Sequence, residues 1–82
     1  MQTKPRQFNI QIRNKTLFYH YYFTTEGTAY KSGLINLVIQ ADDPGTKILK
    51  GIRITVPNTY ADKPDREIEL LAKAEVLNFY SK

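Results

Sequence analysis

The chain of 82 residues is long enough for one domain, 1–82, with a thin hydrophobic core, and it is too short for two. Its composition, 41% hydrophobic and 24% charged, excludes an intrinsically disordered chain. The lack of cysteine excludes disulfides, thiol nucleophiles and cysteine-based metal sites, and no apolar run approaches the ~18 residues of a membrane span. We therefore expect a cytoplasmic protein with no membrane partner.

The net charge of +4 is unevenly distributed along the chain. Acidic and basic residues cancel in residues 42–82, so the positive excess lies in residues 1–41. The only acidic residue in that half is Glu26. Basic charge beside aromatic side chains is typical of surfaces that bind single-stranded nucleic acid, although excess basic residues can also serve solubility alone. The basic residues of this half are Lys4, Arg6, Arg13, Lys15 and Lys31.

The first part of the chain predicts an arm, a strand and a turn. Residues 1–6 are polar and include a proline, so we expect a flexible basic arm. Phe8, Ile10 and Ile12 then alternate with polar residues, which indicates a strand with one solvated face. The pair Asn14-Lys15 predicts a tight turn into a second, antiparallel strand.

The most distinctive segment is 17–25, which contains five aromatic residues and the only histidine of the chain. Successive side chains of a strand point to opposite faces of the sheet, so this strand carries rings on both faces. One set of rings is expected to be covered, whereas the other faces solvent or a partner. The two sets are Leu17, Tyr19, Tyr21 and Phe23 on one face, and Phe18, His20, Tyr22 and Thr24 on the other.

Two further strands are predicted. The segment 34–40 has Ile35, Leu37 and Ile39 on its inner face. The turn residues that follow, 42–45, include two adjacent aspartates, which we interpret as turn residues and not as a metal site. The fourth strand is expected over 48–56, with a bulge at Gly51, and it ends because Pro57 cannot donate to a ladder.

The end of the chain predicts one helix, which is capped by Asp62 and runs to about Asn78 or Phe79. One apolar stripe suits packing on the sheet: Ile68, Leu71, Ala72, Val76 and Phe79. A second stripe on nearly the opposite side suits a homodimer interface formed with the same helix of another subunit: Leu70, Ala74 and Leu77.

The predicted fold class is therefore α+β. Four antiparallel strands form one sheet, followed by one C-terminal helix packed on one face (ββββα). The same order of elements is found in certain single-strand-binding transcription cofactors that dimerise through their helix, which is a fold-level analogy without a shared motif.

No motif in the sequence predicts catalysis. The chain has one histidine and none of the phosphate-loop, dinucleotide, zinc or hydrolase-elbow spacings. His20 lies within the aromatic strand, where a histidine hydrogen-bonded in a sheet face is the expected role. We expect a non-catalytic protein with no cofactor and no metal.

We interpret the sequence as that of a small protein that binds single-stranded nucleic acid. Phe18, His20 and Tyr22 would stack on bases, and the basic side chains of Arg13, Lys15, Lys31 and Arg53 would contact phosphates. The alternative is a protein–protein interaction module, an accessory subunit or inhibitor, that uses the same aromatic face. DNA and RNA are not distinguished by these residues.

Overall fold

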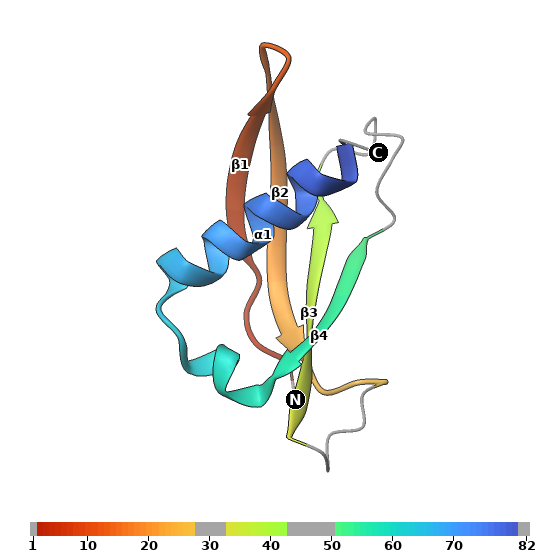
Figure 1. The fold of residues 1–82 in the computed structure, drawn as a ribbon, viewed down its shortest axis with the longest axis vertical. Helices are drawn as coiled ribbons and strands as arrows, with labels where there is room; N and C mark the ends of the chain where they lie inside the picture. Colours follow the sequence, from red (N-terminus) through yellow and green to blue (C-terminus); the bar gives the residue numbers. More distant parts are fainter. Residues whose placement is uncertain (1, 28–32, 43–50, 81–82) are drawn as a thin grey trace.

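The computed structural model describes residues 2–27, 33–42 and 51–80. They form four strands and two helical segments, in the order that the sequence predicts for the strands and the C-terminal helix (Figure 1). The ββββα fold class is confirmed. The elements are β1 (Arg6–Ile12), β2 (Lys15–Thr24), β3 (Leu34–Ala41), β4 (Ile52–Pro57), the short 3-10 helix η2 (Asn58–Asp62) and α1 (Asp65–Tyr80).

The strands form one antiparallel sheet in the order β1-β2-β3-β4, so each strand pairs with its neighbours in sequence. Alternation places two sets of side chains on opposite faces. The inner face carries the side chains of the core, among them Tyr19, Leu37 and Ile39, none of which is exposed. The predicted inward positions in β1 and β3 are confirmed by their burial.

The turn between β1 and β2 differs from the predicted Asn14-Lys15 pair. Ile12 pairs with Lys15, so the two turn residues are Arg13 and Asn14. Both have positive φ angles, 50° and 66°, as a type I′ turn requires at its two central positions. Asparagine tolerates this conformation, and the pairing register of the two strands imposes it on the arginine as well. Lys15 is therefore the first residue of β2.

Helix α1 lies across the inner face of the sheet, over β1 and β2, and the β1–β2 hairpin extends beyond it (Figure 1). Ile68, Ala72 and Val76 are buried against the core, as the first apolar stripe predicts. Leu71 is half-buried, whereas Phe79 is exposed. Among residues 2–27, 33–42 and 51–80, no helix covers the outer face of the sheet (Figure 1).

The helix begins later than the predicted cap at Asp62. Asp62 ends η2, and Lys63 adopts an extended conformation with φ −71° and ψ 152°. A residue that precedes proline disfavours the helical conformation, so Lys63 separates the two helical segments. The carbonyl oxygen of Pro64 accepts hydrogen bonds from the backbone N–H groups of Glu67 and Ile68, and α1 starts at the next residue.

The chain at the N-terminal end of β1 lies beside β2. The backbone N–H of Thr3 donates to the carbonyl of Phe23 (3.0 Å), whose own N–H donates to the Thr3 hydroxyl (2.9 Å). Gln2 forms an isolated bridge with Thr24, one position out of register with the β1–β2 ladder. The flexible arm over 1–6 stays a prediction. The assignment of residues 1–82 to a single domain stays a prediction as well.

Part of the predicted fourth strand, 48–50, lies outside the described residues, as do Asp43, Pro44 and Gly45. Within the described residues, β4 begins at Ile52, after Gly51. Gly51 has a φ of 130°, a conformation that side chains rarely adopt, so this position favours glycine. None of the helices in the described part of the chain is long and apolar enough to span a membrane.

Candidate functional site

The outer face of the sheet carries the three rings that the sequence places together. Phe18 is 48% exposed, and His20 and Tyr22 are half-buried. The rings of His20 and Tyr22 are nearly parallel, with an angle of 14° between their planes and 6.3 Å between their centroids. Because β2 rises about 3.3 Å per residue, Phe18 and Tyr22 lie about 13 Å apart along one strand. The outer face therefore presents one open ring next to a pair of stacked rings.

His20 is held in place by a polar network that joins three strands and the chain after β3. Its Nδ1 lies 2.5 Å from Oδ1 of Asp42, and its Nε2 lies 3.1 Å from Oε1 of Gln40. Gln7 on β1 donates from Nε2 to the other carboxylate oxygen of Asp42 at 3.0 Å. The carboxylate fixes a proton on Nδ1 of His20, because a carboxylate can only accept. The network orients the imidazole plane beside Tyr22.

The carboxyl group of Asp42 has a shifted pKa. Partial burial raises its pKa, but the hydrogen bonds from Gln7 and His20 and the charge of His20 lower it further than burial raises it. The pKa of Asp42 is therefore below its ordinary value of 3.8. The carboxylate stays ionised at neutral pH, and its charge is engaged by groups of the same face.

The cations predicted to contact phosphate lie at two separate places. Arg13 and Lys15 are exposed at the tip of the β1–β2 hairpin, the end of the sheet next to Phe18. Arg53 lies on β4 in the cross-strand row of Tyr22 and Val38, on the same outer face. Lys31 lies outside the described residues. Lys15 shares the inward-facing positions of Leu17 and Tyr19, so its side chain starts from the face opposite the rings. Arg53 is the described cation on the ring face, two strands away from Tyr22.

The chain after β2 folds across the outer face beside Arg53. The carbonyl oxygen of Glu26 accepts hydrogen bonds from Nδ2 of Asn36 (3.2 Å) and from Nη1 of Arg53 (3.3 Å). Asn36 in turn accepts a hydrogen bond from the hydroxyl of Thr55 at 2.9 Å. These hydrogen bonds cover Asn36, which is buried although it is on the outer face. They also leave Phe18 and His20 as the more open end of that face.

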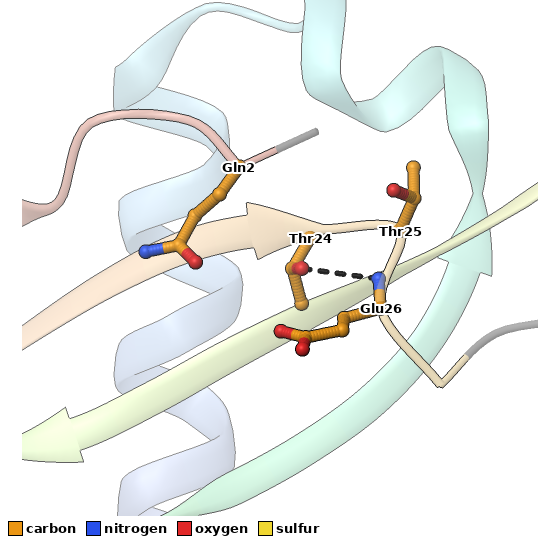
Figure 2. Close-up of a pocket in the computed structure, with 4 residues that line it drawn as sticks. All are labelled: Gln2, Thr24, Thr25 and Glu26. Atoms are coloured by element: carbon orange, nitrogen blue, oxygen red, sulfur yellow. Dashed lines mark hydrogen bonds between the residues drawn. The ribbon is translucent and has the colours of Figure 1, made fainter.

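A shallow hollow lies at the end of β2 (Figure 2). It is lined by Gln2, Thr24, Thr25 and Glu26, and the backbone N–H of Glu26 donates to the Thr24 hydroxyl at 3.1 Å. Its lining carries no ring and no basic side chain. We do not include it in the candidate site.

The second stripe of α1 faces away from the sheet. Leu70 is 62% exposed and Leu77 is 45% exposed, and Ala74 between them is exposed as well. The three positions predicted for a homodimer interface therefore lie on one solvent-exposed face of the helix. They are on the opposite side of the molecule from Phe18.

The sequence analysis missed three members of the polar network: Gln7, Gln40 and Asp42. The pairing register explains why they meet, because His20 lies between Gln7 on β1 and Gln40 on β3. The backbone N–H of Asp42 also donates to the carbonyl of Phe18, which continues the β2–β3 ladder by one residue. The sequence held one signal for this network: all three residues are polar and occupy positions whose side chains point to the outer face.

The chain matches no protein-family model, and no curated protein and no solved structure is significantly similar to it. Within residues 2–27, 33–42 and 51–80, no group of three histidine, cysteine or carboxylate side chains is placed to hold a metal ion.

Proposed function

We propose that this protein is a small, non-catalytic, cytoplasmic protein that binds single-stranded nucleic acid on the outer face of its sheet. The observation that carries the proposal is the exposure of Phe18 beside the stacked rings of His20 and Tyr22, on the face opposite α1. Stacking of a base on an aromatic side chain contributes about 1–3 kcal/mol and tolerates any base.

The ring geometry supports stacking because it is set before a ligand arrives. The hydrogen bonds of His20 to Asp42 and Gln40 restrict the rotation of the imidazole. A side chain that is already ordered loses less conformational entropy on binding than a mobile one. Bases could therefore follow β2 from Phe18 towards Tyr22.

The charges near the rings support a path for the phosphate backbone. Arg13 and Lys15 make no ion pair among the described residues, so both are available to an anion. Arg53 keeps its full charge while one of its N–H groups donates to the Glu26 carbonyl. Lys31 belongs to the proposal on the sequence alone.

A homodimer formed through Leu70, Ala74 and Leu77 is part of the proposal. An antiparallel pair of α1 helices related by a two-fold axis at Ala74 brings Leu70 of each copy opposite Leu77 of the other, because both lie about one turn from Ala74. The small side chain of Ala74 permits close approach of the helices. Light scattering after size exclusion tests it, and Leu70→Asp is expected to shift the mass to that of a monomer.

The stacking proposal is tested by titrating labelled single-stranded DNA and RNA with the protein and with Phe18→Ala. We expect the variant to bind roughly 5- to 100-fold more weakly, the loss of one stacked base. The matched control is Phe79→Ala, which removes an exposed phenyl ring from the helix and should leave binding unchanged. The proposal is contradicted if the protein binds neither single-stranded DNA nor single-stranded RNA at low salt. It is also contradicted if Phe18→Ala binds as tightly as the original chain.

A protein partner on the same face is the second candidate. The Asp42 carboxylate favours it, since a negative charge beside His20 opposes a close phosphate, whereas an exposed ring with polar neighbours suits a protein interface. Salt separates the two candidates. Binding through phosphates weakens steeply as salt rises, and a ring-centred protein contact responds little.

A further inference from the structure

The strand β1 is an edge of the sheet, and its outward backbone groups are unpaired within the described structure. In a two-residue hairpin, the two residues that flank the turn form a hydrogen-bonded pair. Ile12 and Lys15 flank this turn, so every second residue of β1, from Arg6 to Ile12, directs its backbone N–H and C=O groups to β2. The bond from the Asp42 N–H to the Phe18 carbonyl confirms this alternation, because Phe18 directs its backbone groups to β3. The residues whose N–H and C=O groups point away from the sheet are Gln7, Asn9 and Gln11.

These three residues are accessible to another strand. All are exposed, and none of their backbone groups has a hydrogen-bond partner among the residues that the structure describes. Natural edge strands are usually protected by an interior charge, a proline or a bulge. From Gln7 to Ile12 the sequence has neither a charged residue nor proline, and the ladder with β2 is continuous. This stretch can add a strand without rearrangement of the sheet.

Charge at both ends of β1 indicates what kind of strand would fit. Arg13 and Lys15 lie at one end, and Arg66 lies beside the other end, and none of the three forms an ion pair among the described residues. Neither β1 nor β2 contains a carboxylate. At the Arg66 end, the carboxylates of Asp65 and Glu69 are paired with Arg6 and Lys73, so Arg66 carries the charge without an ion pair there. Within the described structure, the edge is therefore neutral in its centre and has an unpaired positive charge at each end.

A second copy of the chain fits this edge poorly. Antiparallel self-pairing centred on Asn9 places Arg13 of each copy opposite Pro5 of the other, between that copy's Lys4 and Arg6. Like charges that face each other across a strand pair are destabilising. The same cations attract a strand that has carboxylates at its ends, so the charge pattern selects a different chain over a copy.

A hollow beside the edge offers a position for one side chain of such a strand. It has a volume of about 230 Å³ and lies where β1 meets the start of α1. Arg6 and Asp65 in its wall form an ion pair at 3.0 Å, whereas the guanidinium of Arg66 remains available. An acidic side chain that enters from the edge can pair with Arg66. The lining residues are Arg6, Gln7, Tyr21, Asp65, Arg66 and Glu69.

We propose that β1 is a docking edge for an extended acidic segment of another protein, which adds a fifth strand to the sheet. Backbone hydrogen bonds to Gln7, Asn9 and Gln11 supply affinity, and carboxylates at both ends of the segment meet Arg66 on one side and Arg13 and Lys15 on the other. The backbone groups of this edge are distinct from the rings proposed to stack on bases, whereas Arg13 and Lys15 serve both proposals, so the two ligands should compete for the hairpin tip.

The test is selection of peptides from a random displayed library, followed by binding of the selected peptides to variants. We expect the selected peptides to carry Asp or Glu near both ends. Asn9→Pro removes an outward N–H without removing a bond to β2, and should weaken binding by about tenfold or more. Asn9→Thr keeps the N–H and suits a strand, so it should bind within about twofold of the original chain.

Amide hydrogen exchange on the unmodified protein gives a second measurement that does not depend on folding of the proline variant. Binding should slow exchange at Gln7, Asn9 and Gln11. Phe18→Ala should bind the peptide unchanged, which separates this surface from the nucleic-acid proposal. The inference is overturned if no acidic peptides are enriched, if folded Asn9→Pro binds them as tightly, or if protection appears elsewhere.

Discussion

The imidazole Nδ1 of His20 lies 2.5 Å from Oδ1 of Asp42, although the two residues are 22 positions apart in the sequence. This contact joins the middle of β2 to the residue that follows β3. It holds the ring that lies in the centre of the candidate site, through a carboxyl group whose pKa is lowered by its hydrogen bonds.

Replacing Asp42 by asparagine should lower the free energy of unfolding by about 0.5–1.5 kcal/mol at neutral pH, the usual net contribution of a hydrogen bond, because the carboxylate accepts from Gln7 and His20. The pKa of Asp42 is lower in the folded state than its ordinary 3.8. The stabilisation is therefore fully present above 3.8 and is lost as the pH falls through the folded-state pKa. Urea denaturation at neutral and acidic pH measures the difference, which should vanish in acid.

Asp62→Asn is the control for this effect, since Asp62 is an exposed carboxylate in η2 without an ion pair among the described residues. It should leave the free energy of unfolding nearly unchanged at both pH values. A loss of stability in Asp42→Asn that persists unchanged in acid would mean that the charge is not responsible.

Replacing Arg13 by glycine should separate stability from nucleic-acid binding. The positive φ of 50° is costly for arginine and free of strain for glycine, so we expect a gain of about 0.5 kcal/mol in unfolding free energy. Removal of the charge should reduce the salt dependence of binding by about 0.7 in the log–log slope, the value of one phosphate contact on a single strand.

Lys15→Gln is the matched variant for Arg13→Gly, because it removes a charge from the same hairpin tip without changing a turn residue. It should reduce the salt slope by a similar amount and add no stability. Denaturation and salt-dependent titration of both variants check the two effects. An unchanged slope in both would remove the hairpin tip from the phosphate path.

Truncation of two aliphatic residues of α1 should change the free energy of unfolding by very different amounts. Ile68 is 2% exposed in the core, so Ile68→Ala should cost about 2–5 kcal/mol, a large share of the stability of a small domain. Leu70 is 62% exposed on the other side of the helix, so Leu70→Ala should change the stability of the monomer by less than about 0.5 kcal/mol. Thermal and urea denaturation at low protein concentration compare them, and equal losses would contradict the packing of α1.

Alkaline pH should weaken the fold through Tyr19. Burial raises the pKa of this phenol, and its hydrogen bond with the hydroxyl of Tyr80 (2.8 Å) raises it further. The folded-state pKa exceeds the ordinary value of 10, so this stabilisation is complete below pH 10 and declines as the pH rises above it. In denaturation experiments at increasing pH, Tyr19→Phe should therefore lose stability less steeply above pH 10 than the original chain.

Much of the fold follows from local patterns in the sequence. Alternation in 8–12 and 34–40 identifies two strands and their inner faces, and the spacing of Ile68, Ala72 and Val76 identifies the buried stripe of α1. These patterns are reliable because a shift of one residue in a strand would expose every core side chain.

The differences arise where long-range pairing overrides local preference. The register of β1 with β2 moves the turn to Arg13 and Asn14, against the preference of arginine for negative φ. The meeting of His20 with Asp42 and Gln40 depends on the β2–β3 register, which no local pattern specifies. For the candidate site, the sequence therefore predicted which rings share a face but not which side chains hold them.

Helix α1 is last among the described elements, yet it covers the apolar face that β1, β2 and β3 create first (Figure 1). During synthesis the sheet can pair strand by strand, since each strand joins the one before it. Until the helix has left the ribosome, Tyr19, Leu37 and Ile39 remain in contact with water. We therefore expect truncation before Ile68 to yield an aggregating nascent chain, because such a chain exposes a sheet of unprotected hydrophobic side chains.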